Sequence, residues 1–285
     1  MKEESVEEVK PKRNRLTNFL IILVIILLSL LMYSKYVETR LIRVKEYLVS
    51  ESSVPSNFNG VNVVYFSDLL YGTVDDKFVS NLVDKINDMK PDIVLFGGSL
   101  ISKEYKLSSN DKKELVKSLS KIDSTIGKYY VNSFIDKENT KEIMESSGFI
   151  NKDNIGEFVY NDSNTPLCIY GIGSYNSGKS DVSGLVNCNG YYTIVFTHEG
   201  DIFDKVLELD FKPNIMFSGN SLGGEVNLPF YNNLIKYKGS NKYYLDYYNK
   251  SNIRIYVSNG LGTDKLGLRL NNFPSFTFIR LKSTD

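Results

Sequence analysis

Side chains that could carry chemistry are scarce in this sequence of 285 residues, which contains a single histidine. That residue, His198, closely follows a predicted buried strand at 192–196. Asp68 follows another predicted strand, at 62–66, in the same way. Layered α/β folds place their sites at the C-terminal edges of strands, so the two side chains are candidates for one site. Imidazole and carboxylate groups both present lone pairs that bind metal ions.

A second pattern, at Gly173–Ser180, matches the nucleotide-binding P-loop literally. In such a site Lys179 would reach the terminal phosphate, and Ser180 would bind the magnesium ion. A P-loop also needs a long helix directly after it, with the helix N-terminus facing the phosphates. Here the following segment, 181–190, is short and contains glycine. We therefore expect a polar, glycine-rich loop rather than an ATP site.

The elements that must position these residues alternate between strands and helices, and strands then dominate. Apolar residues at helical spacing predict helices over 75–89 and 112–122, and a shorter helix over 202–209. Short apolar runs predict strands at 43–49, 62–66, 92–96, 129–131, 167–170, 192–196, 215–217, 253–257 and 276–281. This order predicts an α/β or α+β layered fold with central sheets.

From about residue 38 to residue 281 the chain resembles the membrane-anchored, calcineurin-like metallophosphoesterases. Five segments carry the resemblance, in the family's order: Val54–Gly60, Ser67–Asp68, Pro91–Gly98, Ser218–Pro229 and Val257–Pro274. The last of them is similar to the family's C-terminal hairpin. The resemblance implies a four-layer sandwich of two mixed sheets flanked by helices, preceded by one transmembrane helix.

Four family motifs show where this chain departs from the family. The family's Asp-x-His stands here as Asp68–Leu70, and its Gly-Asp stands as Gly98–Ser99. Its Gly-Asn-His-Asp aligns with Ser133–Asp136, and its Gly-His-x-His aligns with Gly219–Leu222. In the family these motifs hold two metal ions, which share a carboxylate and a hydroxide and clamp the phosphate under attack.

Of eight site positions, Asp68 and His198 keep the family's residue. The other six positions carry Leu70, Ser99, Phe134, Ile135, Asn220 and Leu222. The serine and the asparagine are at best weak neutral ligands, and the four apolar side chains coordinate nothing. Two remaining ligands do not hold a binuclear centre, because zinc alone wants about four.

We therefore expect no cofactor, and a former site that has become a packed, metal-free core. His198 would be buried and hydrogen-bonded to Asp68 or Asn220. One alternative is a single-metal site for manganese, zinc or iron built from these three residues. Another is a Ser99–His198–Asp68 hydrolase triad, for which the sequence shows neither an oxyanion hole nor a directed Ser–His bond.

Residues 16–34 carry no charge and are almost entirely aliphatic. As a helix they would span roughly 28 Å, close to the thickness of a bilayer core. No small-x-small cleavage site follows, so we expect an uncleaved anchor rather than a signal peptide. Basic residues in a short leading tail favour an inside N-terminus. The predicted organisation is a basic cytoplasmic tail over 1–15, a transmembrane anchor over 16–34 and an extracytoplasmic metallophosphoesterase-like domain over 35–285.

Charge and cysteine content limit the other functions. With 34 basic and 34 acidic residues the net charge is zero, so we expect no nucleic-acid partner. Cys168 and Cys188 are too few for a disulfide framework. We expect two small buried hydrophobes, although an outer domain would allow them to pair. Tyrosines crowd segment 231–248 and would either bind sugars or a protein, or pack as a hairpin on the sheet.

These observations predict a single-pass protein of the cell membrane whose hydrolase site is inactive. Its role would be to bind or regulate an envelope protein, or a phosphorylated or glycan-containing envelope component. A residual metal-dependent phosphoesterase is the alternative. An open pocket around the remaining ligands would favour that alternative, and a pocket plugged by Leu70, Phe134 and Leu222 would favour the binding protein.

Overall fold

The computed structural model describes residues 15–230 and 234–284, and two six-stranded mixed sheets form its centre. The first sheet has the order β1-β12-β2-β3-β4-β5 and is parallel except between β12 and β2. Its strands are β1 (Arg43–Glu51), β2 (Asn62–Phe66), β3 (Ile93–Phe96), β4 (Gly127–Tyr130), β5 (Ile150–Asn151) and β12 (Ser275–Ser283).

The second sheet has the order β10-β11-β9-β8-β7-β6. It is parallel at its centre and antiparallel at its two edges, between β10 and β11 and between β6 and β7. Its strands are β6 (Ile155–Val159), β7 (Leu167–Ile172), β8 (Thr193–Glu199), β9 (Ile215–Gly219), β10 (Tyr247–Lys250) and β11 (Ile253–Val257).

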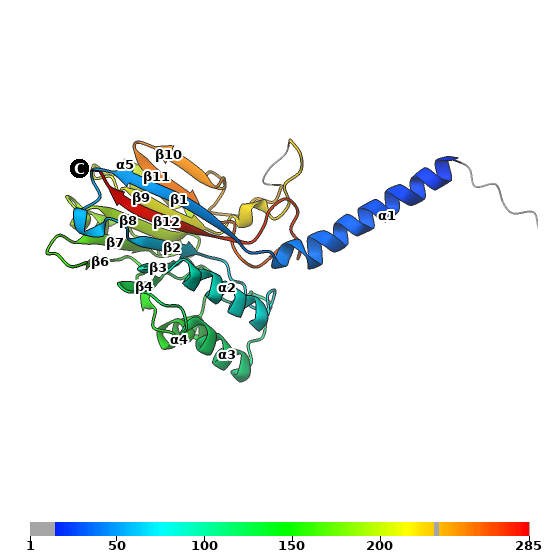
Figure 1. The fold of residues 1–285 in the computed structure, drawn as a ribbon, viewed down its shortest axis with the longest axis horizontal. Helices are drawn as coiled ribbons and strands as arrows, with labels where there is room; N and C mark the ends of the chain where they lie inside the picture. Colours follow the sequence, from blue (N-terminus) through cyan, green and yellow to red (C-terminus); the bar gives the residue numbers. More distant parts are fainter. Residues whose placement is uncertain (1–14, 231–233, 285) are drawn as a thin grey trace, which may run out of the picture.

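Helices cover the outer faces of both sheets and complete four layers (Figure 1). Three lie on the first sheet and one on the second: α2 (Asp76–Asp88), α3 (Ser109–Leu119), α4 (Glu138–Ser146) and α5 (Phe203–Glu208). Side chains of a strand alternate between its two faces. In β3, Val94 and Phe96 therefore pack under the helices, while Ile93 and Leu95 fill the space between the sheets. The predicted four-layer sandwich is confirmed.

Local sequence accounts for the two longest helices of the globular part. Asp75 caps α2, because its side chain accepts a hydrogen bond from Phe78 N at 2.9 Å. Ser108 and Asp111 form a reciprocal capping box at the start of α3. Helix α3 begins three residues before the predicted segment, because its first turn is polar and lies outside the apolar spacing.

The C-terminal segment departs from the expected hairpin. Strand β11 pairs with β9 in the second sheet, whereas β12 pairs with β1 and β2 in the first. The connection between them, 258–274, therefore crosses from one sheet to the other, and the expectation of a hairpin is wrong. Short 3-10 turns occupy other connections: η1 (Glu38–Arg40), η2 (Ser56–Phe58), η3 (Ser183–Cys188), η4 (Gly200–Ile202) and η5 (Leu222–Gly224).

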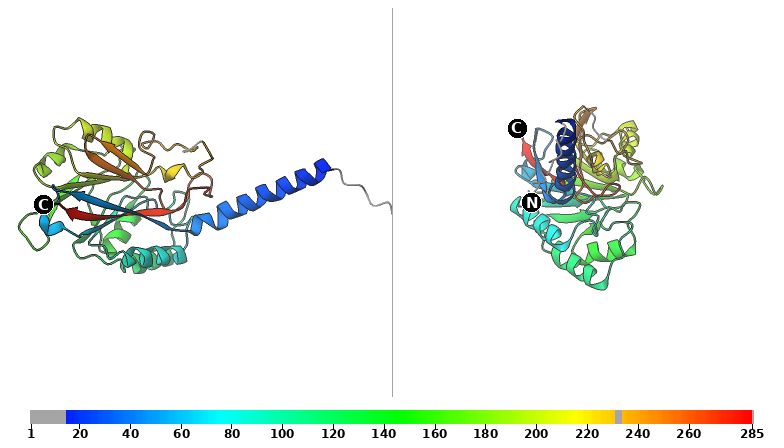
Figure 2. Two further views of the ribbon diagram at one scale, coloured as in Figure 1. Left: turned by 45° about the horizontal axis from the view of Figure 1, so that its top comes forward. Right: turned by 90° about the vertical axis from the view of Figure 1, so that its right-hand side faces the viewer.

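Helix α1 (Arg15–Tyr36) projects away from the layered domain (Figures 1 and 2). It is long and apolar enough to cross a membrane, and no residue of its most apolar stretch is buried. Its C-terminal end is fixed to the domain, since Arg269 N donates to Ser34 O at 3.0 Å and Asn272 N donates to Glu38 Oε1 at 2.7 Å. The predicted tail over 1–15 lies outside the described residues except for Arg15.

Cys168 in β7 and Cys188 at the end of η3 form a disulfide, with their Cα atoms 5.7 Å apart. Both side chains are buried in the cluster between the second sheet and its covering helix. The expectation of two unpaired cysteines is therefore wrong, although their burial is as expected. The sequence could not decide this point, because pairing depends on bringing a strand and a turn together across twenty positions.

Replacing both cysteines by alanine is expected to lower the free energy of unfolding by roughly 3 kcal/mol, because the bridge closes a loop of about 20 residues in the unfolded chain. Thermal unfolding of the full chain with and without reductant measures this. Reductant should destabilise the native chain and leave the double variant unchanged. Equal stability of the native chain in both conditions would contradict a disulfide.

Candidate functional site

Two loops that follow β2 and β9 bring the predicted site residues together. Four of these residues have left-handed backbone conformations: Asp68 (φ 53°), Leu70 (φ 48°), Asn220 (φ 61°) and Leu222 (φ 48°). For residues with a side chain this conformation costs roughly 1–2 kcal/mol each, most for bulky ones. Such strain persists only where surrounding contacts enforce it, and it clusters at functional sites. The loops therefore keep a constrained shape although their side chains are largely apolar.

Hydrogen bonds to Asp68 join the two loops. Its Oδ2 accepts from Ser67 Oγ at 2.7 Å and from the backbone N of Asn220 at 2.9 Å. Its Oδ1 lies 2.8 Å from Nε2 of His198. Asp68 is 3% exposed, so a carboxylate without these partners would be costly here. The residue acts as the central acceptor of the site.

His198 is buried between two carboxylates. Its Nε2 contacts Asp68, and its Nδ1 lies 3.1 Å from Oε1 of Glu199. Consecutive side chains of a regular strand point to opposite faces. Strand β8 is irregular between Phe196 and Glu199, and this irregularity accompanies the placement of Glu199 beside its neighbour. The expected hydrogen bond between His198 and Asp68 is present.

The charge state of His198 follows from this arrangement. Burial alone would lower the pKa of His198, but the charges of Asp68 and Glu199 and the hydrogen bonds to them outweigh burial. Together they raise the pKa of His198 to about 10. At neutral pH the ring is therefore a buried imidazolium, with one N–H directed at each carboxylate. Both ring nitrogens of His198 then carry a proton, so neither offers the lone pair that a metal ion would need.

The alternative of a Ser99–His198–Asp68 triad does not fit the structure. Ser99 Oγ lies 3.2 Å from Nε2, the same ring nitrogen that contacts Asp68. A triad places serine and carboxylate on different nitrogens. Glu199 does contact the other nitrogen, but the closer Asp68 holds the proton on Nε2. The ring cannot accept the serine proton in this arrangement.

The remaining donors do not fit a divalent ion. The side-chain Nδ2 of Asn220 donates to Lys238 O at 2.8 Å and to Ser240 Oγ at 2.9 Å, so its amide is already bound to another loop. Among residues 15–230 and 234–284, no group of three His, Cys, Asp or Glu side chains could hold a metal. A metal would have to displace the imidazolium proton and would still lack ligands.

Leucines occupy the positions of two family histidines. Leu70 is 5% exposed and Leu222 is 2% exposed, and both pack with Tyr237. Glycines of the crossing segment make room for them. A Cβ on Gly260 would lie 2.5 Å from Leu222 Cδ2, and a Cβ on Gly262 would lie 2.6 Å from Leu70 Cβ. The surrounding fold thus accommodates both leucine side chains.

The candidate site is not fully packed, which corrects the expectation of a closed core. Phe134 is 51% exposed, and its ring lies 6.4 Å from the ring of His198 without plugging the site. A pocket of about 580 Å³ remains, lined by Asp68, Leu70, Ser99, Phe134, Ile135, His198, Asn220, Leu222 and Tyr237 among others. Its lining combines polar and apolar side chains.

Comparison with known proteins finds relatives that match most of the chain. No protein-family model matches it. Over 263 residues it is 27% identical to the "Uncharacterized metallophosphoesterase YkuE" of Bacillus subtilis, covering 89% of this chain and 90% of that protein. It is also 24% identical over 237 residues to the "Uncharacterized metallophosphoesterase YkoQ" of the same organism, covering 76% of this chain and 82% of that protein. The similarity to these two metallophosphoesterases confirms the resemblance drawn from the motifs.

The sequence gives no specific sign of two contacts in this site. Glu199 lies beside His198 at the irregular part of β8, which a strand pattern alone does not indicate. Tyr237 lies in the tyrosine-crowded segment, but nothing in the sequence indicates that it packs on Leu70 and Leu222. Both depend on tertiary contacts.

The glycine-rich segment Gly173–Ser180 is a structural loop, as expected. Tyr175 N donates to Oε2 of Glu199 at 2.9 Å, and Gly173 N donates to Asn154 Oδ1 at 2.9 Å. Lys179 N donates to Ser174 O at 3.2 Å. These amides are used within the protein, and a six-residue 3-10 turn follows in place of the long helix of a P-loop.

Raising the pH is expected to destabilise the folded chain through His198. Below about pH 6.5 the ring is protonated in both the folded and the unfolded chain, and its contribution to stability is complete. As the pH rises towards about 10, the unfolded chain gives up the proton and the folded chain keeps it, so the contribution is lost. Thermal unfolding measured from about pH 6 to about pH 9 should show this slope. His198→Gln should lack it, and equal slopes would contradict a buried imidazolium.

Proposed function

We propose that this chain is a membrane-anchored, catalytically inactive member of the metallophosphoesterase family that acts by binding at the cell envelope. One observation supports this most strongly. Leu70 and Leu222 are buried in strained loops, at the positions of two family histidines, and pack against glycines that leave room for them. A sequence under selection for hydrolysis would need ligands at these positions.

The charge arrangement supports the same proposal. His198 is held as an imidazolium between Asp68 and Glu199, so the site carries its own cation. The positive charge offsets the two buried carboxylates, as a bound metal would do in an active homologue. The arrangement can stabilise the loops and bind a ligand, but it cannot generate a nucleophilic hydroxide.

The location follows from α1 and from the disulfide. We propose that α1 spans the membrane once, with its N-terminus inside and the layered domain outside. Its length and apolar character support an anchor. The bond between Cys168 and Cys188 supports an outer domain, because disulfides persist in oxidising compartments.

The pocket above the site suits a ligand with both polar and apolar parts. Its floor offers Ser99 and the imidazolium, and its walls include Ile135 and the exposed ring of Phe134. Lys103 also lines it and supplies a positive charge. We propose an envelope protein segment, or a phosphorylated or glycan-containing envelope component, as the partner.

The proposal is tested by assaying the purified full chain in detergent with p-nitrophenyl phosphate and bis-p-nitrophenyl phosphate in the presence of manganese. The expected result is turnover no higher than that of His198→Gln prepared in the same way. Metal-dependent turnover that the His198→Gln variant lacks would overturn the proposal.

A reduced, single-metal phosphoesterase is the second candidate. The pocket lined by Asp68, His198 and Asn220 is open and Phe134 does not plug it, which is the outcome that the sequence argument took to favour this candidate. The protonated ring of His198 between two carboxylates weighs against it, because a metal ion would have to displace a ring proton.

A further inference from the structure

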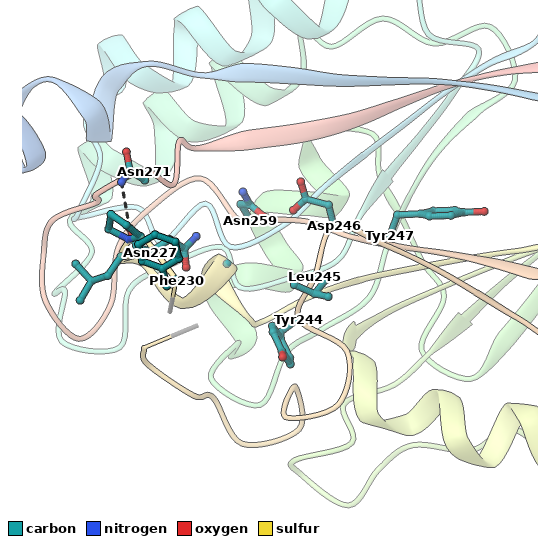
Figure 3. A pocket seen from close by; sticks show the side chains of 11 residues that line it. Asn227, Phe230, Tyr244, Leu245, Asp246, Tyr247, Asn259 and Asn271 are labelled. Carbon is teal, nitrogen blue, oxygen red and sulfur yellow. Dashed lines mark hydrogen bonds between the residues drawn. The ribbon is translucent and has the colours of Figure 1, made fainter. Parts of the chain in front are cut away.

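A second pocket lies beside the segment that is rich in tyrosine. Its volume is about 660 Å³, and its walls come from 227–230, 244–247 and the polar residues Asn259 and Asn271 (Figure 3). The site over Asp68 and His198 does not include these residues. The pocket is therefore a separate feature that the proposed function leaves unexplained.

The tyrosine-rich segment divides into a packed half and an exposed half. Tyr243 is fully buried, with its ring 5.6 Å from that of Phe203 in α5. Tyr248 OH accepts from the backbone N of both Tyr244 and Leu245 and so shapes the turn before β10. Tyr247 is 42% exposed. Packing, one of the two alternatives drawn from the sequence, describes Tyr243, whereas binding by the exposed Tyr247 stays a prediction. Tyr231 lies outside the described residues.

Three aromatic rings line the pocket: Phe230, Tyr244 and Tyr247. Phe230 is fully exposed, so its ring is accessible to a ligand. Tyrosine rings combine a flat apolar face with a polar edge. Such faces complement the C–H faces of sugar rings.

Polar groups of the pocket suit hydroxyls rather than phosphates. Asp246 and Asn259 share one cation, because Lys45 Nζ donates to Oδ1 of each, at 2.6 and 2.8 Å. The Asp246 side chain remains 56% exposed. Among the described residues that line the pocket, none is lysine or arginine. A phosphate would meet a carboxylate without a free cation, whereas hydroxyl or amine groups would find acceptors.

We propose that this pocket binds a hydroxyl-rich, uncharged or amino sugar, with Phe230 and Tyr244 as apolar platforms and Asp246 and Asn259 as polar partners. The sugar would belong either to a free glycan or to the headgroup of a neutral glycolipid. The proposal does not depend on whether the site at His198 binds metal.

The pocket lies close to the domain end of α1. Arg269 N donates to Ser34 O in the last turns of α1, and the next residue, Leu270, accepts from Asn227 N at 2.8 Å. Asn227 lines the pocket, next to the exposed Leu228 and the pocket residue Phe230. If α1 crosses the membrane as proposed, the pocket opens near the lipid surface. Both sources of the sugar are therefore within reach.

The test uses the full chain in phosphatidylcholine nanodiscs, with chitotetraose as the soluble sugar. A second arm places the full chain in phosphatidylcholine nanodiscs that also contain monogalactosyl diacylglycerol. Because the chain contains no tryptophan, Tyr247→Trp supplies a single fluorescent reporter for either arm. Nanodiscs of phosphatidylcholine alone and of phosphatidylcholine with phosphatidylglycerol provide the background.

Sugar-dependent signals are expected in at least one arm. Tyr244→Ala and Phe230→Ala should each weaken binding by about tenfold, the loss of one aromatic contact. Tyr160→Ala is the matched control, since this tyrosine is 59% exposed and follows β6, at the opposite edge of the sheet from β10.

Each outcome assigns or rejects a source of the sugar. Binding of chitotetraose assigns a free glycan, and a fluorescence change only in the galactolipid nanodiscs assigns a headgroup. No signal in either arm, or a signal that Tyr244→Ala and Phe230→Ala leave unchanged, overturns the inference. A chain that does not insert into any nanodisc contradicts the membrane anchor instead, and titration of chitotetraose in detergent still tests the pocket.

Discussion

Replacing His198 by alanine is expected to lower the free energy of unfolding by roughly 3–5 kcal/mol, because it leaves the carboxylates of Asp68 and Glu199 buried without the cation between them. Both are nearly inaccessible to water, at 3% and 0% exposure. Solvent therefore cannot replace the lost charge. The effect is one of folding stability, measured by chemical denaturation of the full chain in detergent.

Ser99→Ala is the matched control for this variant. Its hydroxyl lies 3.2 Å from the same ring nitrogen but carries no charge. Its removal should cost about 1 kcal/mol or less. If His198→Ala is as stable as Ser99→Ala, the ring is not part of a buried ion cluster, and the description of an imidazolium between two carboxylates is wrong.

Restoring the family's ligands is expected to convert a chain without metal into one that binds about one divalent ion. The triple variant Leu70→His, Ser99→Asp and Leu222→His adds three donors to Asp68 and His198. The two leucine positions already have left-handed backbones, and a pocket of about 580 Å³ remains above them. The loops thus have room for imidazole side chains.

The control is a second triple variant, Leu70→Asn, Ser99→Asn and Leu222→Asn. Its three new side chains are polar but are weaker metal ligands than histidine and aspartate. Metal binding by calorimetry with manganese and zinc compares the two variants. The histidine and aspartate variant should bind, and the asparagine variant should not. A folded histidine variant without metal would show that the loops no longer hold the family's site geometry.

The fold was largely predictable because burial determines its elements. β2 and β3 are short apolar runs, and their side chains fill both faces of the first sheet. Helix α2 has apolar residues at helical spacing and an aspartate cap. Where the signal was weak, the sequence failed. α4 buries only Thr140, Ile143 and Met144 within nine residues, and the edge strand β6 is mostly exposed and contains a glycine.

The sequence identified the residues of the candidate site, but it did not determine how tightly they pack or which carboxylates contact His198. Motif order located Asp68, Leu70 and Leu222, because glycines and strand ends remain in place. Whether the apolar replacements close the site depends on three-dimensional packing. Phe134 turned out to be exposed, and Glu199 turned out to share the imidazolium. The disulfide likewise required knowing that β7 and η3 meet.

Metal content is the measurement that tests the central claim most directly. The full chain, purified in detergent and dialysed against manganese and zinc, is analysed by inductively coupled plasma mass spectrometry beside His198→Gln. The claim of a retired metal site predicts no metal above background in either protein. Near-stoichiometric metal in the native chain that disappears in His198→Gln would contradict it.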